Sequence, residues 1–454
     1  MNRCLIDIND AGIRISDASG LLRQSPGLAF LQHGELLTGE QAAAQFRTNP
    51  RAGSDRFWHQ LSQTPLPRAL GPARTHADLA WYHLRELWTP LAADYDQVLL
   101  TVGGDFDPER LSTLLGIARA CDMPVRSVVA SAVAAAASHW QVDAAAADDE
   151  LVCVDAQWHR LLLEPLQIRA GQVSTEATTP LQQTDVVRHG LAALYDRWAH
   201  MIAEAFLQRT RYDPLHNAAS EQQLYDELPG WLQRLTTQPQ LQLKLSAGGH
   251  DFNIELEREH FSAAAAELYA PLLQQAAARQ RPLLLRQRLT LLPGLVEQLQ
   301  QHAEVHVVAD DTVSSHLLRI AADLISDDAD AVRHHLVLAL ADADAKTNSA
   351  IPTTSAALPP THLSDGVSLW RLDDAGLELP PPGPGQLAPA SVARLLRHSD
   401  GRVSLQPGSA QAMAALQINA EPVAMAATGS PPSLQAGDRI TVAGEQFVLL
   451  RQVH

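Results

Sequence analysis

One segment of the sequence separates two parts that have different hydrophobic patterns. Residues 341–364, ADADAKTNSAIPTTSAALPPTHLS, are rich in Ala, Ser, Thr and Pro, a composition typical of linkers. A chain of 454 residues is also too long for one compact core. We therefore predict a domain over residues 1–340, a linker over 341–364 and a second domain over 365–454.

The part before the linker mixes strand and helix patterns. Its first 45 residues alternate apolar and polar side chains between turn signals, which predicts a β-meander. Further on, strand-like runs alternate with stretches of helical spacing, and Asp107 followed by Pro108 is typical of a helix start. We predict an α/β domain. Its expected helices cover residues 76–93, 107–122, 131–140, 184–211, 259–280, 294–303 and His334–His335, and its expected strands cover 96–106, 123–129, 150–155, 282–289 and 305–308.

The composition excludes several classes of function. A formal net charge of −17 argues against binding to nucleic acid or to an anionic membrane surface, because both need clustered Lys and Arg. The N-terminus, MNRCLIDIND, lacks the apolar run of a signal peptide, and no stretch approaches 18 apolar residues. Cys4, Cys121 and Cys153 fall in expected core segments without a zinc-type spacing. We expect a cytoplasmic protein with reduced thiols and no metal site.

Three segments resemble a known family. These are GEQAAAQFRTNP (39–50), DQVLLTVGGDFDPERLSTLLGIARACDMPVRSVV (96–129) and NIELEREHFSAAAAELYAPLL (253–273). Together with the order of strands and helices over residues 1–325, they resemble the nucleotide-binding domain of the 70-kDa heat-shock chaperones, in the actin-like ATPase superfamily. The resemblance implies a two-lobed actin-like ATPase fold, with ATP clamped by two hairpin turns and a third loop.

Both hairpin turns depart from the family's glycine-rich pattern. The first, normally D-x-G-T-T, corresponds to Asp7, Ile8, Asn9, Asp10 and Ala11, so that Asp10 places a negative charge where a phosphate would lie. The second, normally D-x-G-G-G-T, corresponds to the six residues from Asp155 to Arg160 and includes Gln157, Trp158 and His159. Side chains of this size block the close backbone approach that glycine permits.

Two further positions depart from the family. Ser131 stands where the resemblance expects the magnesium-linked acid, and Arg286 and Gln287 replace the glycine pair of the adenosine loop. The family's catalytic lysine has no clear match, and Arg56 and Arg68 are the nearest candidates. We therefore predict that ATP hydrolysis is lost.

The basic residues of these loops allow two interpretations. In the favoured one, Arg286, Arg288, Arg160 and His159 fill the vacated cleft and pair with Asp7, Asp10 and Asp155. In the other, they offer positive charge to an anion such as ATP with Mg²⁺. The first predicts no cofactor, and the second predicts a nucleotide-binding switch or weak ATPase.

The part after the linker has short strand-like runs with regular turns, which predicts a β-sandwich. Its end, LQAGDRITVAGEQFVLL (434–450), and the turn around Asn419 resemble a forkhead-associated (FHA) domain, which binds phosphothreonine peptides. Gln386 stands in place of the family's phosphate-binding Arg, and Arg394, three residues after Ser391, in place of its His. We expect phosphate-independent protein docking. A remaining phosphate contact by Arg394 and a purely stabilising role are the alternatives.

These expectations combine into one hypothesis and its competitors. The favoured hypothesis is a catalytically inactive pseudo-ATPase that serves as a cytosolic scaffold or adaptor and binds protein partners through both domains. The alternative is a nucleotide-binding switch that uses Asp7, Asp155 and the nearby arginines. A filament subunit has no support beyond superfamily membership.

Overall fold

The structure is a computed structural model of a mixed α/β chain. It describes residues 1–142, 149–175, 185–187, 189–326, 328 and 331–342, and after residue 342 only the short strands given below. Backbone contacts divide the chain into two compact units. Unit 1 comprises Met1–Ala18 and Arg23–Lys346, and unit 2 comprises Ser19–Leu22 and Thr347–His454.

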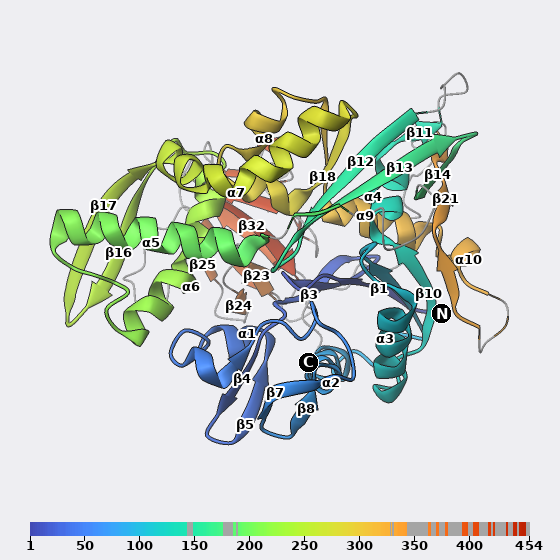
Figure 1. Cartoon of the computed structure of the whole chain (residues 1–454), viewed down its shortest axis with the longest axis horizontal. Helices are drawn as coiled ribbons and strands as arrows, with labels where there is room; N and C mark the ends of the chain where they lie inside the picture. The colour runs from blue at the N-terminus through green and yellow to red at the C-terminus, as the bar shows by residue number, and fades with distance from the viewer. Residues whose placement is uncertain are drawn as a thin grey trace. The chain divides into compact units, whose positions relative to one another are not determined.

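The first large sheet of unit 1 has six strands in the order β20-β10-β9-β1-β2-β3 (Figure 1). β1 is antiparallel to β2, whereas β1, β9, β10 and β20 pair in parallel. The sheet therefore begins with a meander and continues with parallel strands. The bounds are β1 Arg3–Ile8, β2 Ile13–Asp17, β3 Gly20–Ser25, β9 Gln97–Val102, β10 Val125–Ala130 and β20 Arg333–His335.

The second large sheet repeats this arrangement, in the order β19-β18-β12-β13-β14-β21, with β15 beside β13. β12, β13 and β14 form an antiparallel meander, and β12, β18 and β19 pair in parallel. Parallel strands thus extend each sheet from the first strand of its meander, three in the first sheet and two in the second. The bounds are β12 Asp149–Ala156, β13 Leu161–Arg169, β14 Gln172–Thr175, β15 Asp185–Val187, β18 Leu283–Arg286, β19 Val305–Val308 and β21 Val337–Ala339.

Two helices lie between the sheets and join their cores (Figure 1). α4 (Ser131–His139) follows β10 of the first sheet but packs on β12, β13, β14 and β18 of the second. α9 (Asp310–Arg319) follows β19 of the second sheet but packs on β1 and β2 of the first. The alanines of α4 are fully buried and let the helix approach both sheets closely, so that one continuous core spans them.

Side-chain caps mark the starts of α2 and α3. Asp107 accepts a hydrogen bond from the Arg110 backbone at the start of α3 (Pro108–Ala120), as predicted. Thr75 and Asp78 form a capping box on α2 (His76–Trp88). The other helices of unit 1 are α1 Gly39–Ala43, α5 Leu191–Thr210, α6 Ala218–Leu235, α7 Arg258–Arg279, α8 Leu295–Leu299 and α10 Ala321–Leu324, with 3₁₀ turns η1 Pro50–Ala52 and η2 Gln287–Leu291.

Short strands complete unit 1. Three form the sheet β5-β4-β6, and the pairs β7–β8, β16–β17 and β11–β22 stand apart. Their bounds are β4 Ala29–Gln32, β5 Glu35–Thr38, β6 Gly53–Ser54, β7 Pro65–Leu70, β8 Ala73–Thr75, β11 Gln141–Val142, β16 Gln240–Ala247, β17 His250–Glu257 and β22 Ala341–Asp342.

An ion pair, a cation–π contact and hydrogen bonds join the segment that contains α1 and Arg47 to helices α5 and α6. The Arg47 guanidinium lies 3.0 Å from Asp196 Oδ1 and covers the Tyr225 ring with 3.5 Å to its centroid. The Gln222 side chain accepts from the Arg47 backbone at 2.8 Å and donates to the Ala43 carbonyl at 2.9 Å. Elements far apart in the sequence are thereby held together beside the two large sheets.

Three predicted elements were wrong in detail. The strand expected over 282–289 ends at Arg286 and continues as η2, because its polar second half leaves the sheet. The helix expected from 184 begins at Leu191, after β15. His334 and His335 lie in β20 and not in a helix, because the edge of β10 is open for pairing there.

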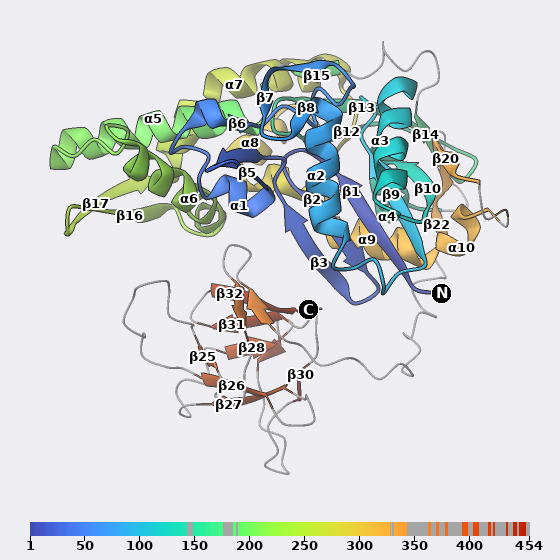
Figure 2. The ribbon, with the colours of Figure 1, turned by 90° about the horizontal axis from the view of Figure 1, so that it is seen from below.

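Unit 2 is described only by strands, which form two sheets (Figure 2). One has the order β24-β23-β32-β31-β28-β29 and the other β25-β26-β27-β30, and their pairings are antiparallel. Arg394 lies exposed in β26, whereas Gln386, Ser391 and Asn419 fall outside the described residues. The bounds are β23 His362–Ser364, β24 Leu369–Arg371, β25 Leu377–Leu379, β26 Ala393–Arg397, β27 Val403–Pro407, β28 Leu416–Ile418, β29 Glu421–Pro422, β30 Ser433–Leu434, β31 Arg439–Val442 and β32 Glu445–Leu450.

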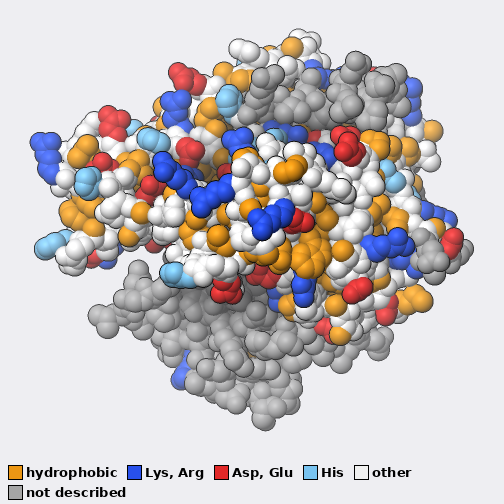
Figure 3. All heavy atoms as spheres, turned by 60° about the horizontal axis from the view of Figure 1, so that its bottom comes forward, with side chains coloured by type: hydrophobic (Ala, Val, Ile, Leu, Met, Phe, Trp, Pro, Cys, Tyr) orange, Lys and Arg blue, Asp and Glu red, His pale blue; other side chains and the backbone are white. Residues whose placement is uncertain are grey.

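Figure 3 shows one face of the molecule, on which basic and acidic side chains are interspersed. Neither sign of charge dominates this face. Within the described residues, no helix has the length and apolar character needed to cross a membrane.

Candidate functional site

The candidate site lies where the two meander turns of unit 1 meet. The first turn joins β1 to β2 and carries Asn9 and Asp10, and the second joins β12 to β13 and carries Trp158. The Asn9 amide donates to Asp155 Oδ2 at 3.2 Å and to the Ala156 carbonyl at 3.1 Å. The Trp158 backbone N–H donates to Asp10 Oδ1 at 2.6 Å. The two turns are therefore bonded directly to each other.

Backbone N–H groups of both turns are bound within the chain. In the first turn, Ala11 N–H donates to Asn9 Oδ1 at 2.9 Å and Gly12 N–H donates to the Asn9 carbonyl at 3.0 Å. In the second, Gln157 N–H donates to the Arg160 carbonyl at 2.8 Å. A phosphate-binding turn instead keeps such donors free for the anion.

The N-terminus of α5 is hydrogen-bonded to the second turn, which contains no glycine. Leu191 N–H donates to the Gln157 carbonyl at 3.0 Å, and Ala192 N–H donates to the Trp158 carbonyl at 2.8 Å. Gly190 permits this contact, because a Cβ there would lie 2.2 Å from the Arg160 nitrogen. Helix N–H groups that lack a partner inside the helix are thus used to fix the turn.

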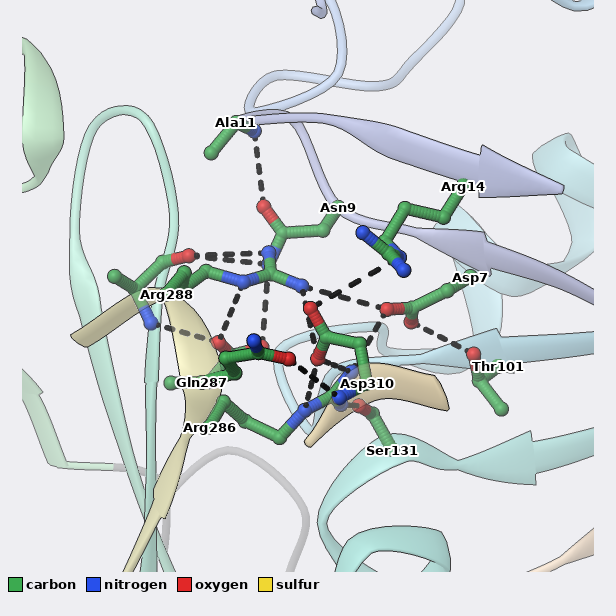
Figure 4. A network of polar contacts seen from close by, with 12 residues as sticks. Asp7, Asn9, Ala11, Arg14, Thr101, Ser131, Arg286, Gln287, Arg288 and Asp310 are labelled. Atoms are coloured by element: carbon green, nitrogen blue, oxygen red, sulfur yellow. Dashed lines mark hydrogen bonds and ion pairs between the residues drawn. The ribbon is translucent and has the colours of Figure 1, made fainter. Parts of the chain in front are cut away.

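Arg286 lies at the centre of a buried ion-pair cluster (Figure 4). Its guanidinium donates to Asp7 Oδ2 at 3.0 Å, to Asp310 Oδ1 at 2.7 Å and to Ser131 Oγ at 2.6 Å. The residue is only 2% exposed. Burial alone would lower the pKa of Arg286, but Asp310, Asp7 and Asp155 raise that pKa well above its usual value.

Arg288 completes this group, which we call the Arg286 cluster: Arg286, Arg288, Asp7, Asp155 and Asp310. Arg288 lies 3.4 Å from both Asp7 Oδ2 and Asp155 Oδ1. Burial would raise the pKa of Asp310, but the arginines outweigh it and hold that pKa well below its usual value. For Asp155, burial raises the pKa, and Arg288 and Arg286 offset only part of the effect.

Gln287 and Thr101 bind the rim of the Arg286 cluster. The Gln287 side chain accepts from the Asp310 backbone N–H at 3.2 Å, and Thr101 donates to Asp7 Oδ1 at 2.7 Å. A cavity beside Asp7 has a volume of about 10 Å³, which is about the smallest space that holds one water molecule. The chain's own side chains fill the remainder of this site.

A second group, the Asp105 cluster, comprises Asp105, Asp10, Glu164, Arg110 and Arg160. Arg110 donates to Asp105 Oδ2 at 2.5 Å, and Arg160 binds the same carboxylate oxygen. Glu164 lies inside β13 and accepts from the Gly104 backbone N–H at 2.5 Å. Burial, with Asp105 and Asp155 nearby, raises the pKa of Glu164 to about 8. Burial also raises the pKa of Asp10 to about 6, although the Trp158 N–H opposes the shift.

The bulky tip of the second turn contacts the segment before α2. The Trp158 indole N–H donates to Asp55 Oδ2 at 3.3 Å, and His159 Nε2 lies 3.4 Å from the same oxygen. Burial would lower the pKa of His159, but Asp55 outweighs it and raises that pKa. Trp158 and His159 therefore anchor the turn to a neighbouring segment.

The structure brings the predicted site residues of unit 1 together. Arg286 and Arg288 pair with Asp7 and Asp155, as the favoured interpretation expected. His159 instead pairs with Asp55, and Arg160 pairs with Asp105. Asp10 accepts from the Trp158 backbone N–H and pairs with neither of them. The residues predicted at the site are Asp7, Asn9, Asp10, Ser131, Asp155, Gln157, Trp158, Arg286 and Gln287.

Sequence analysis missed three acids of the site. Asp310 begins α9 two residues after β19, and Asp105 lies three residues after β9, so both stand shortly after the end of a strand. Glu164 interrupts the apolar run LLLEPLQI of β13, and an acid in such a run is a signal of a buried polar contact. That signal was available in the sequence.

No protein-family model matches the sequence, and no curated protein matches it. Among the described residues, no group of three His, Cys, Asp or Glu side chains is placed to hold a metal ion.

Proposed function

We propose that the chain is a catalytically inactive pseudo-ATPase that acts as a cytoplasmic protein-binding scaffold or adaptor. In this proposal unit 1 has the two-lobed actin-like fold of the heat-shock-70 nucleotide-binding domain. Unit 2 is an FHA-like sandwich that docks proteins without a phosphate.

The sheet arrangement supports the fold part of the proposal. Two sheets that each extend a three-stranded meander by parallel strands are what a two-lobed duplicated fold requires. The exchange of α4 and α9 between the sheets ties the lobes through one core. In unit 2, two antiparallel sheets are compatible with a sandwich.

One observation carries the loss of ATPase activity: the groups that would grip a triphosphate already bind other parts of the chain. Ala11, Gly12 and Gln157 use their backbone N–H groups within the two turns. Arg286 and Arg288 use their charge on buried aspartates. A nucleotide would have to break this network before it gained any contact, and leaving buried charges unpaired costs about 3–5 kcal/mol.

Thermal unfolding of the full chain with Mg-ATP, Mg-ADP or no nucleotide tests the proposal. A ligand that binds only the folded state at 100 times its Kd adds about 2.7 kcal/mol to the free energy of unfolding. We expect no change in Tm at millimolar nucleotide and no phosphate release. A rise in Tm that disappears in the Asp7→Ala/Asp155→Ala double variant would support the nucleotide-switch alternative.

The scaffold role has its own test. Proteins cross-linked to the full chain are compared in the presence and absence of Mg-ATP. We expect the same direct partners in both samples. Partners that leave only when Mg-ATP is added would contradict a nucleotide-independent scaffold.

A further inference from the structure

Three side chains that line one cavity, next to the contact between the two turns, each carry a buried polar atom without a partner. Asp10 Oδ2, His59 Nδ1 and Arg110 Nε each have no hydrogen-bond partner among the described residues. All three side chains line the same cavity, together with Gln157 and Arg160. Buried polar atoms without a partner are rare, and several around one cavity indicate a small bound ligand.

The other polar side-chain atoms of Asp10 and Arg110 are already occupied. Asp10 Oδ1 accepts from the Trp158 backbone N–H at 2.6 Å. Arg110 donates through Nη1 to Asp105 and through Nη2 to the Trp58 carbonyl at 2.9 Å. The N–H group at Arg110 Nε is therefore a donor without an acceptor, and Asp10 Oδ2 is an acceptor without a donor.

The size of the cavity limits the ligand to one small molecule. Its volume is about 10 Å³, which is about the minimum for a single water. A phosphate, a carboxylic acid or any part of a nucleotide would need the surrounding side chains to move apart.

The charges around the cavity favour a neutral ligand. Asp10 lines it with negative charge, Arg110 and Arg160 line it with positive charge, and Asp105 pairs with both arginines. An anion would meet Asp10 Oδ2 directly, and a cation would meet the guanidinium of Arg110. The His59 ring is tilted against the His159 ring, with 5.3 Å between ring centroids. Burial lowers the pKa of His59 to about 4, so its ring is neutral at pH 7.

We propose that one water molecule occupies this cavity, accepts the Arg110 Nε–H and donates its two O–H groups to Asp10 Oδ2 and His59 Nδ1. The hydrogen-bond inventory matches, because a water offers two donors and up to two acceptor sites. The water links the β1–β2 turn, the segment that precedes α2, and α3. Through Asp10 it also reaches Trp158 on the second sheet. The inference does not rest on the proposed function.

A high-resolution crystal structure of the full chain tests this directly. We expect one density peak about 2.7–3.2 Å from Asp10 Oδ2, His59 Nδ1 and Arg110 Nε. A bromide-soaked crystal should show no anomalous peak at this position. An empty cavity, an anomalous bromide peak, or direct bonding among the three side chains would overturn the proposal.

A measurement in solution gives a second, independent readout. Magnetic relaxation dispersion of water ¹⁷O counts waters that stay buried for long times. We expect one such water fewer in His59→Phe, whose larger ring fills the cavity and lacks the acceptor, and no change in His302→Phe, where the histidine is exposed. An equal count in His59→Phe and the parent chain would contradict the water site. If His59→Phe fails to fold, the crystal structure of the unaltered chain still decides.

Discussion

The Arg286 cluster and the Asp105 cluster contain the same kinds of groups and differ in how they are paired. Each has three carboxyl groups and two arginines in a buried setting. In the Arg286 cluster, the arginines are shared among Asp7, Asp155 and Asp310. In the Asp105 cluster, both arginines bind Asp105, and the carboxyl groups of Asp10 and Glu164 are left to backbone N–H donors.

This difference in geometry separates the pKa values. Burial acts to raise the pKa of Asp310, Asp10 and Glu164, and only a close guanidinium reverses the shift. The pKa of Asp310 falls well below its usual value, whereas those of Asp10 and Glu164 rise to about 6 and about 8. The placement of charges, more than their number, therefore decides which acids are ionised in the folded chain.

Arg286→Met should have the largest effect on stability, because it removes the central arginine of the Arg286 cluster. Asp7 and Asp310 would remain buried with only the more distant Arg288 and Arg14 as cations. Breaking a buried ion pair typically costs about 3–5 kcal/mol of unfolding free energy. Chemical denaturation of the full chain measures the loss.

The matched control is Arg197→Met, which breaks the exposed Arg197–Glu267 pair. Such pairs contribute about 0–1 kcal/mol. If the two variants lose the same stability, the Arg286 cluster is not the stabilising network described here.

Glu164→Gln should act in the opposite direction and depend on pH. The pKa of Glu164 is about 8 in the folded chain, against an ordinary value of 4.5, so the parent chain loses stability as the pH rises from 4.5 to 8. At about 1.4 kcal/mol per unit, the loss between pH 5 and pH 7 is about 3 kcal/mol. The variant does not titrate and keeps an acceptor for the Gly104 N–H.

Denaturation curves of both proteins at several pH values measure this difference. Near pH 4.5 the two should be similar, and at pH 8 the variant should be more stable. A constant difference at all pH values would show that Glu164 is paired with a cation after all.

Asp10→Asn should give a smaller gain of the same kind. The pKa of Asp10 rises from 3.8 to about 6 in the folded chain, so its cost appears between these values and is complete at pH 7. We expect the variant to be about 3 kcal/mol more stable at pH 7 and little changed near pH 4. The Asn oxygen still accepts from Trp158 N–H, so the turn is kept. Thermal unfolding at the two pH values checks the sign, and a less stable variant at pH 7 would contradict the unpaired state of Asp10.

The sequence predicted most elements of unit 1 because their signals are local. The cap at Asp107, the period-two runs of β1 and β2 and the alanine run of α4 each identify an element without knowledge of its neighbours. The three-residue strand around His334 could not be predicted in this way, because it exists only through its pairing with β10.

The candidate site was predictable only in part. Asp7 and Asp155 were found because they match the aspartates that begin the two turns in the resemblance, and Arg286 because it replaces a glycine that the resemblance expects. Its bond to Asp7 joins residues 279 positions apart, so no local pattern encodes it. The division into two clusters depends on which carboxylate each arginine reaches, and that is set by tertiary packing.

Thr101→Val should have the smallest effect and tests one hydrogen bond of the Arg286 cluster. It removes the 2.7 Å hydrogen bond to Asp7 Oδ1 while keeping the volume of the side chain. A hydrogen bond to a charged group contributes about 1.5 kcal/mol, which denaturation can measure. Ser127→Ala is the control, since the buried Ser127 hydroxyl on the neighbouring strand has no hydrogen-bond partner among the described residues, and its loss should cost less.

The same substitution in the Arg286→Met background tests whether Thr101 and Arg286 act on Asp7 together. Without Arg286, Asp7 depends more on Thr101, so Thr101→Val should cost more there than in the parent chain. Such non-additivity is expected for residues that share a partner. If the two losses simply add, the Thr101 hydrogen bond and the Arg286 ion pair stabilise the fold independently, and the cluster does not act as one network.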